Sequence, residues 1–273
     1  MTLGRYRVVV TDVDGTLVDD RQNISDANLE AIRKFQERGG LVTLATGRVE
    51  DSARPFVRAL GIKIPVILYN GAKIFDFKSE TCRFESRLEP FVAETVLAAV
   101  RSFGLDAVFY ADGAAGVLKR SAVIEAYERK DGIRCRELGP DAERFVRRSV
   151  KILVIDETGG FSTIEDALQD VREHCSIVRS EPTYLEVLPK GVSKGNALIK
   201  LSEMLGVPLQ AVIAVGDQLN DLDMIRLAGL GVAVGNAHQE VKRAADVVVR
   251  SHLEDAIADI IERYALGGED FGV

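Results

Sequence analysis

The sequence predicts an α/β fold in which a parallel-sheet domain is interrupted by an inserted α+β domain. Residues 1–83 alternate short β-branched apolar runs with amphipathic stretches, in the order strand, helix, strand, helix, strand. This alternation is typical of a parallel sheet covered by helices. Residues 84–188 mix short strands and helices, and the earlier alternation returns over residues 189–273. We therefore expect a core of residues 1–83 and 189–273 and an insert of residues 84–188, a size that suits a small domain.

The first part of the core should contain three strands and two helices. The strands are expected at residues 6–10, 41–45 and 65–69, and the helices at residues 25–38 and 50–60. Ser25 suits an N-cap, and Gly39 suits the end of the first helix. Alternating residues 73–77 and 81–84 predict a hairpin before the insert.

The insert is predicted to hold three helices and five strands. The helices are expected at residues 90–103, 121–129 and 161–174, and the strands at residues 106–110, 116–119, 149–155, 176–179 and 184–188. Residues 130–140 are polar and have no assigned element.

The second part of the core resumes with a helix that Ser193 should cap. Helices are expected at residues 193–205, 221–228 and 253–264, and strands at residues 211–215, 231–234 and 247–249. Gly267 and Gly268 should begin a frayed tail.

Composition limits the functions and locations that the protein could have. The 47% apolar and 28% charged residues are typical of a soluble globular protein, and a net charge of -7 makes general affinity for nucleic acid unexpected. The apolar runs are only strand-length and no basic-then-apolar leader opens the chain, so we expect no membrane span and a cytoplasmic location. The odd number of cysteines, three, predicts unpaired thiols, and His174, His238 and His252 lack the spacing of metal ligands.

Polar side chains follow the predicted core strands and begin one of the core helices. Because ligands bind at the carboxyl ends of the strands in open α/β sheets, we expect these groups to meet at one edge. They are Asp12, Asp14, Thr46, Gly47, Lys194, Asp217, Asn220 and Asp221.

Asp12 and Asp14 point to phosphoryl chemistry. Two carboxylates so close repel each other unless a cation such as Mg²⁺ lies between them. Asp12 could then attack phosphorus, and Asp14 could serve as general acid and base. Taken alone, the pair could equally be a solvated turn.

The remaining groups suit phosphate and metal. Thr46 offers a hydroxyl and Gly47 a backbone N–H, while Lys194 adds positive charge at a helix start. Asp217 and Asp221 could both be metal ligands, or one could orient Lys194; either could instead cap a helix.

The order of these motifs resembles that of the haloacid dehalogenase (HAD) superfamily. The matching segments are residues 12–17, 46–48, Lys194, and Gly216-Asp217 with Asn220-Asp221. Residues 70–72, 188–195 and 235–237 look like the Cof-type branch of phosphatases, and the insert resembles that branch's C2-type cap, of the C2B kind. The resemblance implies a Rossmann-like core and a Mg²⁺-dependent phosphatase that forms an aspartyl-phosphate.

By this resemblance, Asp12 is the nucleophile and a metal ligand, and Asp14 is the acid/base and offers its backbone carbonyl to the metal. Thr46, Gly47, Lys194 and Asn220 would bind phosphate. Asp217 would ligate Mg²⁺, with Asp221 supporting the metal site. Gln218 departs from the family, which more often has a small residue there.

Two other functions stay open: a phosphomutase of the same superfamily, and a non-enzymatic sensor of phosphate ligands. The expected partner is a small phosphorylated metabolite, such as a sugar phosphate or pyridoxal phosphate. Arg48 and Tyr184 are candidate substrate contacts, and Lys119, Arg120 and Arg129 are further candidates in the insert.

Overall fold

The computed structural model describes residues 4–267, which divide into two compact units. The core unit holds the described residues up to Gly47, Ala53–Arg83 and those from Ser193 onward. The inserted unit holds Arg48–Ser52 and Phe84–Val192. The predicted tail from Gly268 lies outside the described residues.

The core unit is built on a parallel sheet in the strand order β14-β13-β12-β1-β2. Its strands are β1 (Val8–Thr11), β2 (Leu41–Leu44), β12 (Val212–Gly216), β13 (Leu230–Ala233) and β14 (Val247–Val248). The three central strands are buried along their whole length, which explains their nearly continuous apolar sequences. The predicted α/β fold with a parallel sheet is confirmed.

An antiparallel sheet continues from the β2 edge. It consists of β3 (Val66–Leu68), β4 (Lys73–Asp76) and β5 (Thr81–Glu85), in that order. A parallel bridge between Ala45 and Ile67 joins it to the main sheet. The carboxyl end of β3 therefore lies beside the segment that follows β2.

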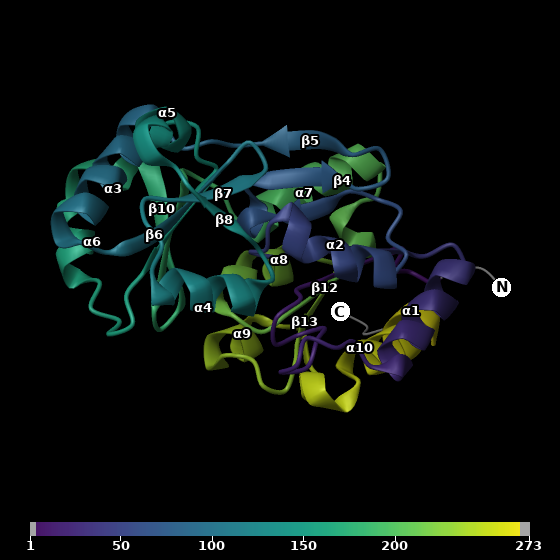
Figure 1. Ribbon diagram of the computed structural model, residues 1–273. Coiled ribbons are helices and arrows are strands. Elements are labelled where there is room, and N and C mark those ends of the chain that lie inside the picture. Colours follow the sequence, from purple (N-terminus) through teal and green to yellow (C-terminus); the bar gives the residue numbers. More distant parts are fainter. Residues whose placement is uncertain (1–3, 268–273) are drawn as a thin grey trace. The chain divides into compact units, whose positions relative to one another are not determined.

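Six α-helices belong wholly or mainly to the described part of the core unit, and the first three residues of α2 count with the inserted unit. They are α1 (Asp26–Glu37), α2 (Glu50–Ala59), α7 (Lys194–Leu205), α8 (Leu222–Leu227), α9 (Gln239–Ala244) and α10 (Ala256–Ile260). Ser25 accepts a hydrogen bond from Asn28 N at 3.2 Å and Ser193 accepts one from Asn196 N at 3.1 Å, so both predicted N-caps are confirmed. Helices α1 and α10 lie side by side (Figure 1).

The inserted unit has a six-stranded sheet in the order β10-β11-β9-β6-β7-β8. Its strands are β6 (Asp106–Ala111), β7 (Ala114–Val117), β8 (Cys135–Glu137), β9 (Lys151–Ile155), β10 (Cys175–Glu181) and β11 (Tyr184–Pro189). Its α-helices are α3 (Pro90–Phe103), α4 (Ala122–Asp131), α5 (Ala142–Val146) and α6 (Ser162–Ala167).

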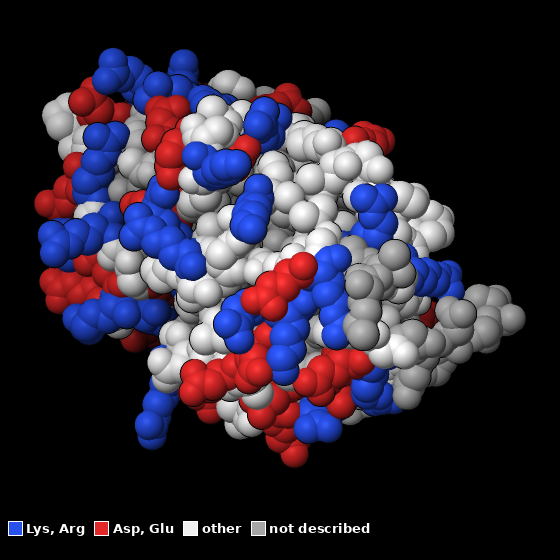
Figure 2. Space-filling model, turned by 90° about the vertical axis from the view of Figure 1, so that its right-hand side faces the viewer, with Lys and Arg blue, Asp and Glu red and all other residues white. Residues whose placement is uncertain are grey.

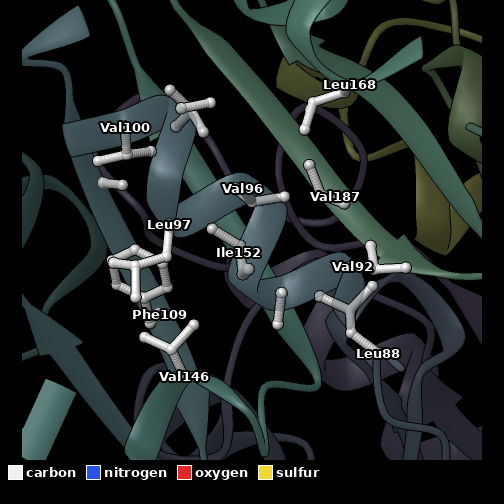
Figure 3. Packing of buried hydrophobic residues seen from close by; sticks show 14 of the residues in the cluster. Leu88, Val92, Val96, Leu97, Val100, Phe109, Val146, Ile152, Leu168 and Val187 are labelled. Atoms are coloured by element: carbon white, nitrogen blue, oxygen red, sulfur yellow. The ribbon is translucent and has the colours of Figure 1, made fainter. Parts of the chain in front are cut away.

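One face of this sheet packs against α3, α5 and α6. Val92 and Val96 of α3 are fully buried over Phe109, Ile152 and Val187 of the strands, as Figure 3 shows. Each such buried side chain contributes about 1.5–3 kcal/mol. The next residue of β6, Tyr110, points to the opposite face, where its hydroxyl bonds that of Tyr127 in α4.

Some predicted elements were wrong. The helix expected at residues 161–174 is two short ones, α6 and a 3₁₀ helix over Gln169–His174. Leu168 and Val171 are both buried, and their three-residue spacing suits the tighter 3₁₀ turn. Likewise, the last predicted helix begins only after Asp255, whose φ of 59° interrupts it.

The described surface mixes charges of both signs. On the face shown in Figure 2, Lys and Arg side chains are interspersed with Asp and Glu. Among helices of the described residues, none combines the length and apolarity needed to cross a bilayer.

Candidate active site

The sheet register brings three of the predicted site segments to one edge. Thr11 pairs with Leu44 on one side and with Val215 on the other. Asp12 N donates to Val215 O at 2.9 Å. The residues after these strands therefore emerge together, as the strand-end rule predicts.

Three carboxylates gather at this edge: Asp12, Asp217 and Asp221. Each offers an oxygen, and these oxygens all lie within 4.8 Å of one another. All three residues are buried, with Asp221 fully inaccessible to solvent. Carboxylate oxygens are the ligands that hard divalent cations prefer, so this donor set fits Mg²⁺.

Lys194 provides the positive charge of the cluster. Its Nζ donates to Asp12 Oδ1 at 2.7 Å and to Asp221 Oδ1 at 2.6 Å, and its side chain is 1% exposed. Lys194 is the first residue of α7, directly after the Ser193 cap, so the start of the helix fixes the backbone position of Lys194. A buried position between two carboxylates distinguishes Lys194 from a solvated surface lysine.

The electrostatics show an excess of negative charge. Burial raises the pKa of Asp12 well above its usual range; Lys194 opposes this rise, and the carboxylates of Asp221, Asp217 and Asp14 add to it. Burial and the neighbouring Asp221 raise the pKa of Asp217 to about 6. Burial opposes the charge on Lys194, but the carboxylates outweigh it and raise the pKa of Lys194. A bound divalent cation would offset this charge imbalance.

Asp217 is held on both oxygens. Thr16 Oγ1 donates to Oδ1 at 2.8 Å, and Gln218 Nε2 donates to Oδ2 at 3.0 Å. Gly15 has a φ of +73°, and a Cβ on it would lie 2.7 Å from Asp217 Oδ2. Only glycine therefore lets the first-strand turn approach this carboxylate so closely.

Asp221 is held by backbone groups. Its Oδ2 accepts from the N–H groups of Asp217 and Gln218, both at 3.0 Å. Its Oδ1 accepts from Lys194. This arrangement closes the loop after β12 and aims Lys194 at Asp12.

Asp14 is not among the clustered carboxylates. Its side chain is exposed, and Gln22 Nε2 donates to its Oδ1 at 3.2 Å. An exposed carboxyl group two residues from Asp12 is accessible for giving a proton to a leaving group and for taking one from water. Metal contact through the Asp14 backbone carbonyl stays a prediction.

The predicted phosphate-binding residues line the same edge. Thr46 is buried, and its carbonyl accepts from Asn70 N at 2.9 Å. Asn220 Nδ2 donates to Asn70 Oδ1 at 3.0 Å. Asn70 thus links the segment after β2 to the loop after β12.

The two predicted substrate contacts lie in the inserted unit. Arg48 donates to Ser52 O at 3.5 Å. The Tyr184 ring packs edge-on against Tyr127 at 5.7 Å, with Lys130 Nζ 4.6 Å above it. Arg120, by contrast, is paired with Glu128 through both guanidinium nitrogens, at 2.8 and 2.7 Å.

A polar cluster also occupies the α4 side of the inserted sheet. Lys151 Nζ donates to Glu186 Oε1 at 2.9 Å, with both side chains almost fully buried. Burial raises the pKa of Asp131 nearby, while Tyr127, Lys151 and Arg48 oppose that shift.

Comparison with known proteins decides the family. The family model for haloacid dehalogenase-like hydrolases matches residues 9–261, nearly the whole chain. The chain belongs to the haloacid dehalogenase-like hydrolases. This confirms the family that the four ordered motifs predicted and its enzyme class, a hydrolase.

Two relatives and one solved structure match over nearly their full length. The 5-amino-6-(5-phospho-D-ribitylamino)uracil phosphatase YcsE of Bacillus subtilis is 31% identical, over 95% of this chain and 96% of its own. The pyridoxal phosphate phosphatase YbhA of Escherichia coli is 26% identical, over 93% and 97%. The crystal structure of a haloacid dehalogenase-like hydrolase from Bacteroides thetaiotaomicron superposes with a TM-score of 0.85 at 29% identity, over 94% and 99%.

Sequence reasoning missed three residues of this edge. Thr16 and Gln218 hold Asp217, and Asn70 holds Asn220. Each stands within or beside a motif quoted for the resemblance, so proximity to a motif was the available signal. The partners of Thr16 and Asn70 could not be read from the chain, because they lie 201 and 150 residues away in sequence.

Proposed function

We propose that the protein is a Mg²⁺-dependent phosphatase that hydrolyses phosphate monoesters of small metabolites through an aspartyl-phosphate on Asp12. The observation that carries this proposal is Lys194, whose ammonium bridges Asp12 and Asp221 inside a buried carboxylate cluster. As the proposed nucleophile, Asp12 would have a fixed positive charge beside it, which favours attack on an anionic ester.

Asp12, Asp217 and the Asp14 backbone carbonyl would hold the metal, with Asp221 supporting them. When bound, Mg²⁺ supplies positive charge that offsets the repulsion between Asp12 and the incoming phosphate. The donor set supports this assignment because it consists of oxygens alone, and because burial together with the neighbouring carboxylates raises the pKa values of Asp12 and Asp217, which a bound cation would oppose.

The reaction has two steps on Asp12. In the first, a carboxylate oxygen of Asp12 bonds to phosphorus as the ester P–O bond breaks, and Asp14 gives its proton to the leaving alkoxide. In the second, Asp14 takes a proton from water, whose oxygen attacks phosphorus. The Asp12–phosphorus bond breaks, which releases inorganic phosphate and regenerates the Asp12 carboxylate and the protonated Asp14.

Four groups would bind the phosphate during both steps. Thr46 supplies a hydroxyl, Gly47 a backbone N–H, Asn220 its carboxamide and Lys194 its ammonium. Preorganised donors of this kind stabilise the charge that develops on the transferring group.

The leaving group would be a small organic alcohol. The two relatives described above are named for a phosphorylated ribitylaminouracil and for pyridoxal phosphate, both small phosphorylated metabolites. Arg48 and Tyr184 are the proposed contacts to this part of the substrate. Arg suits an anionic or polyhydroxylated group, and Tyr offers both a ring and a hydroxyl.

The test is phosphate release from a panel of esters: sugar phosphates, pyridoxal 5′-phosphate, phosphoglycolate and the phosphorylated ribitylaminouracil. Each is measured with Mg²⁺ and with chelator, and with the near-isosteric Asp12→Asn variant as control. Metal-dependent release that the variant lacks supports the proposal. Transfer of phosphoryl groups between sugar phosphates without release would instead indicate a mutase, and binding without either reaction a sensor.

A further inference from the structure

The turn between β3 and β4 has an unusual backbone. Tyr69, Asn70 and Gly71 all have positive φ, at 51°, 54° and 101°. Asparagine and glycine adopt this region readily, but a tyrosine there is an outlier because its Cβ crowds the backbone. Tyr69 and Asn70 are also buried, at 1% and 4% exposure. Strain of this kind persists only where the surroundings fix it, and it concentrates at functional sites.

The turn contacts the segment after β2 through Asn70. The Asn70 N–H donates to Thr46 O at 2.9 Å. A Cβ built on Gly47 would lie 3.1 Å from both Asn70 Nδ2 and Oδ1. The Asn70 carboxamide therefore packs directly against the Gly47 backbone, and it sets how that backbone lies.

The same carboxamide contacts the loop after β12. Asn70 Oδ1 accepts a hydrogen bond from Asn220 Nδ2 at 3.0 Å. This bond orients the carboxamide of Asn220. Asn70 and Asn220 are 150 residues apart, so the bond joins parts of the core unit that are distant in sequence.

The last residue of the turn contacts the start of α7. A Cβ on Gly71 would lie 2.1 Å from Ser193 O and 3.1 Å from Lys194 N. Any side chain at residue 71 would thus push away the helix start that carries Lys194. One strained turn therefore touches the segments of Thr46 and Gly47, of Asn220 and of Lys194.

We propose that Asn70 is a positioning residue that sets the spacing of the phosphate-binding groups Gly47 and Asn220. This inference rests on the proposed phosphatase function and extends it. Asparagine meets both demands of the position, because it adopts positive φ and supplies a carboxamide oxygen that accepts from Asn220. Glycine would meet only the first demand, and aspartate would add negative charge beside the phosphate.

The Asn70→Gly variant distinguishes the role of the Asn70 side chain from that of its backbone conformation. Glycine keeps the left-handed conformation, so the melting temperature should stay within about 4 °C of the wild type. Loss of the carboxamide should lower kcat/KM about 10- to 100-fold, because small displacements of positioned groups have effects of that size. Inorganic phosphate should inhibit about 10-fold less tightly, whereas the Mg²⁺ concentration for half-maximal activity should change less than twofold.

Two further variants control the comparison. Asp255→Gly makes the same kind of change at a φ of 59° at the start of α10, and it should leave kcat/KM within twofold of the wild type. Asn70→Asp keeps the oxygen that accepts from Asn220, and it should weaken inhibition by phosphate at least as much as Asn70→Gly, because it adds charge.

Wild-type kcat/KM and wild-type phosphate inhibition in Asn70→Gly would overturn the inference. So would a loss of activity that comes with a melting temperature more than 10 °C below that of Asp255→Gly, because the side chain would then act only in folding. A wild-type protein that releases phosphate from no ester would instead refute the proposed function itself.

Discussion

Replacement of Lys194 by methionine tests the electrostatic account of the site most sharply. Methionine keeps much of the apolar stem and removes the ammonium, which lies 2.7 Å from Asp12 and 2.6 Å from Asp221. Two buried carboxylates would then lose their common cation. Removal of one partner of a buried ion pair destabilises proteins by about 3–5 kcal/mol. Because Lys194 has two partners, we expect a loss at the upper end of that range at pH 7 without divalent metal.

The assay is urea unfolding of Lys194→Met, with the double variant Lys194→Met/Asp221→Asn beside it. The added asparagine can still accept from the backbone N–H groups of residues 217 and 218, but it carries no charge. The double variant should therefore recover part of the lost stability. Lys151→Met, which removes the ammonium that donates to the buried Glu186, should lose less than Lys194→Met.

Two results would refute this reasoning. A Lys194→Met protein within 1 kcal/mol of the wild type would show that the carboxylates do not depend on the ammonium. A double variant no more stable than the single one would show that the loss has a cause other than unpaired charge.

Three further outcomes follow from the site. The pKa of Asp217 is raised to about 6 in the folded state, so its contribution to stability is complete below the unfolded value near 4 and is lost as the pH rises through 6. Asp217→Asn should therefore gain about 3 kcal/mol of unfolding free energy relative to the metal-free wild type between pH 4 and 7. A difference in unfolding free energy that stays constant over this pH range would contradict this. Gln218→Leu removes a hydrogen bond to Asp217 and should weaken Mg²⁺ binding about 10-fold by calorimetry, while unchanged affinity would exclude a role for Gln218. Asp12→Asn should keep the wild-type circular dichroism spectrum and lose at least about 1,000-fold in kcat; a misfolded variant would make its inactivity uninformative, so the spectrum is recorded first.

The convergence of the site segments at one sheet edge could be predicted from the sequence, because it depends on strand ends that are recognisable locally. Each strand end is visible as an apolar run followed by polar residues, and parallel strands bring their carboxyl ends to one edge. Asp12, Thr46 and Asp217 follow such runs, and Ser193 marks the helix that begins with Lys194. The structure brings these segments together as expected.

The side-chain partners could not be predicted, because they depend on register and on backbone angles. The bond from Thr16 to Asp217 needs the pairing of β1 with β12 to be known residue by residue. The left-handed tyrosine at residue 69 contradicts its own local preference, so tertiary contacts decide it. The short helices α5 and α9 were missed for a related reason, since one and a half turns carry too little periodicity to detect.

The central claim is that Asp12 carries the phosphoryl group, and rapid acid quench during the first turnover tests it directly. The wild-type protein is mixed with Mg²⁺ and a ³²P-labelled ester that it hydrolyses in the panel, and the mixture is quenched and digested. The account predicts acid-stable label on the peptide that contains Asp12 and none in Asp12→Asn. Phosphate release by Asp12→Asn at the wild-type rate, with no label on the wild-type peptide at any quench time, would contradict it.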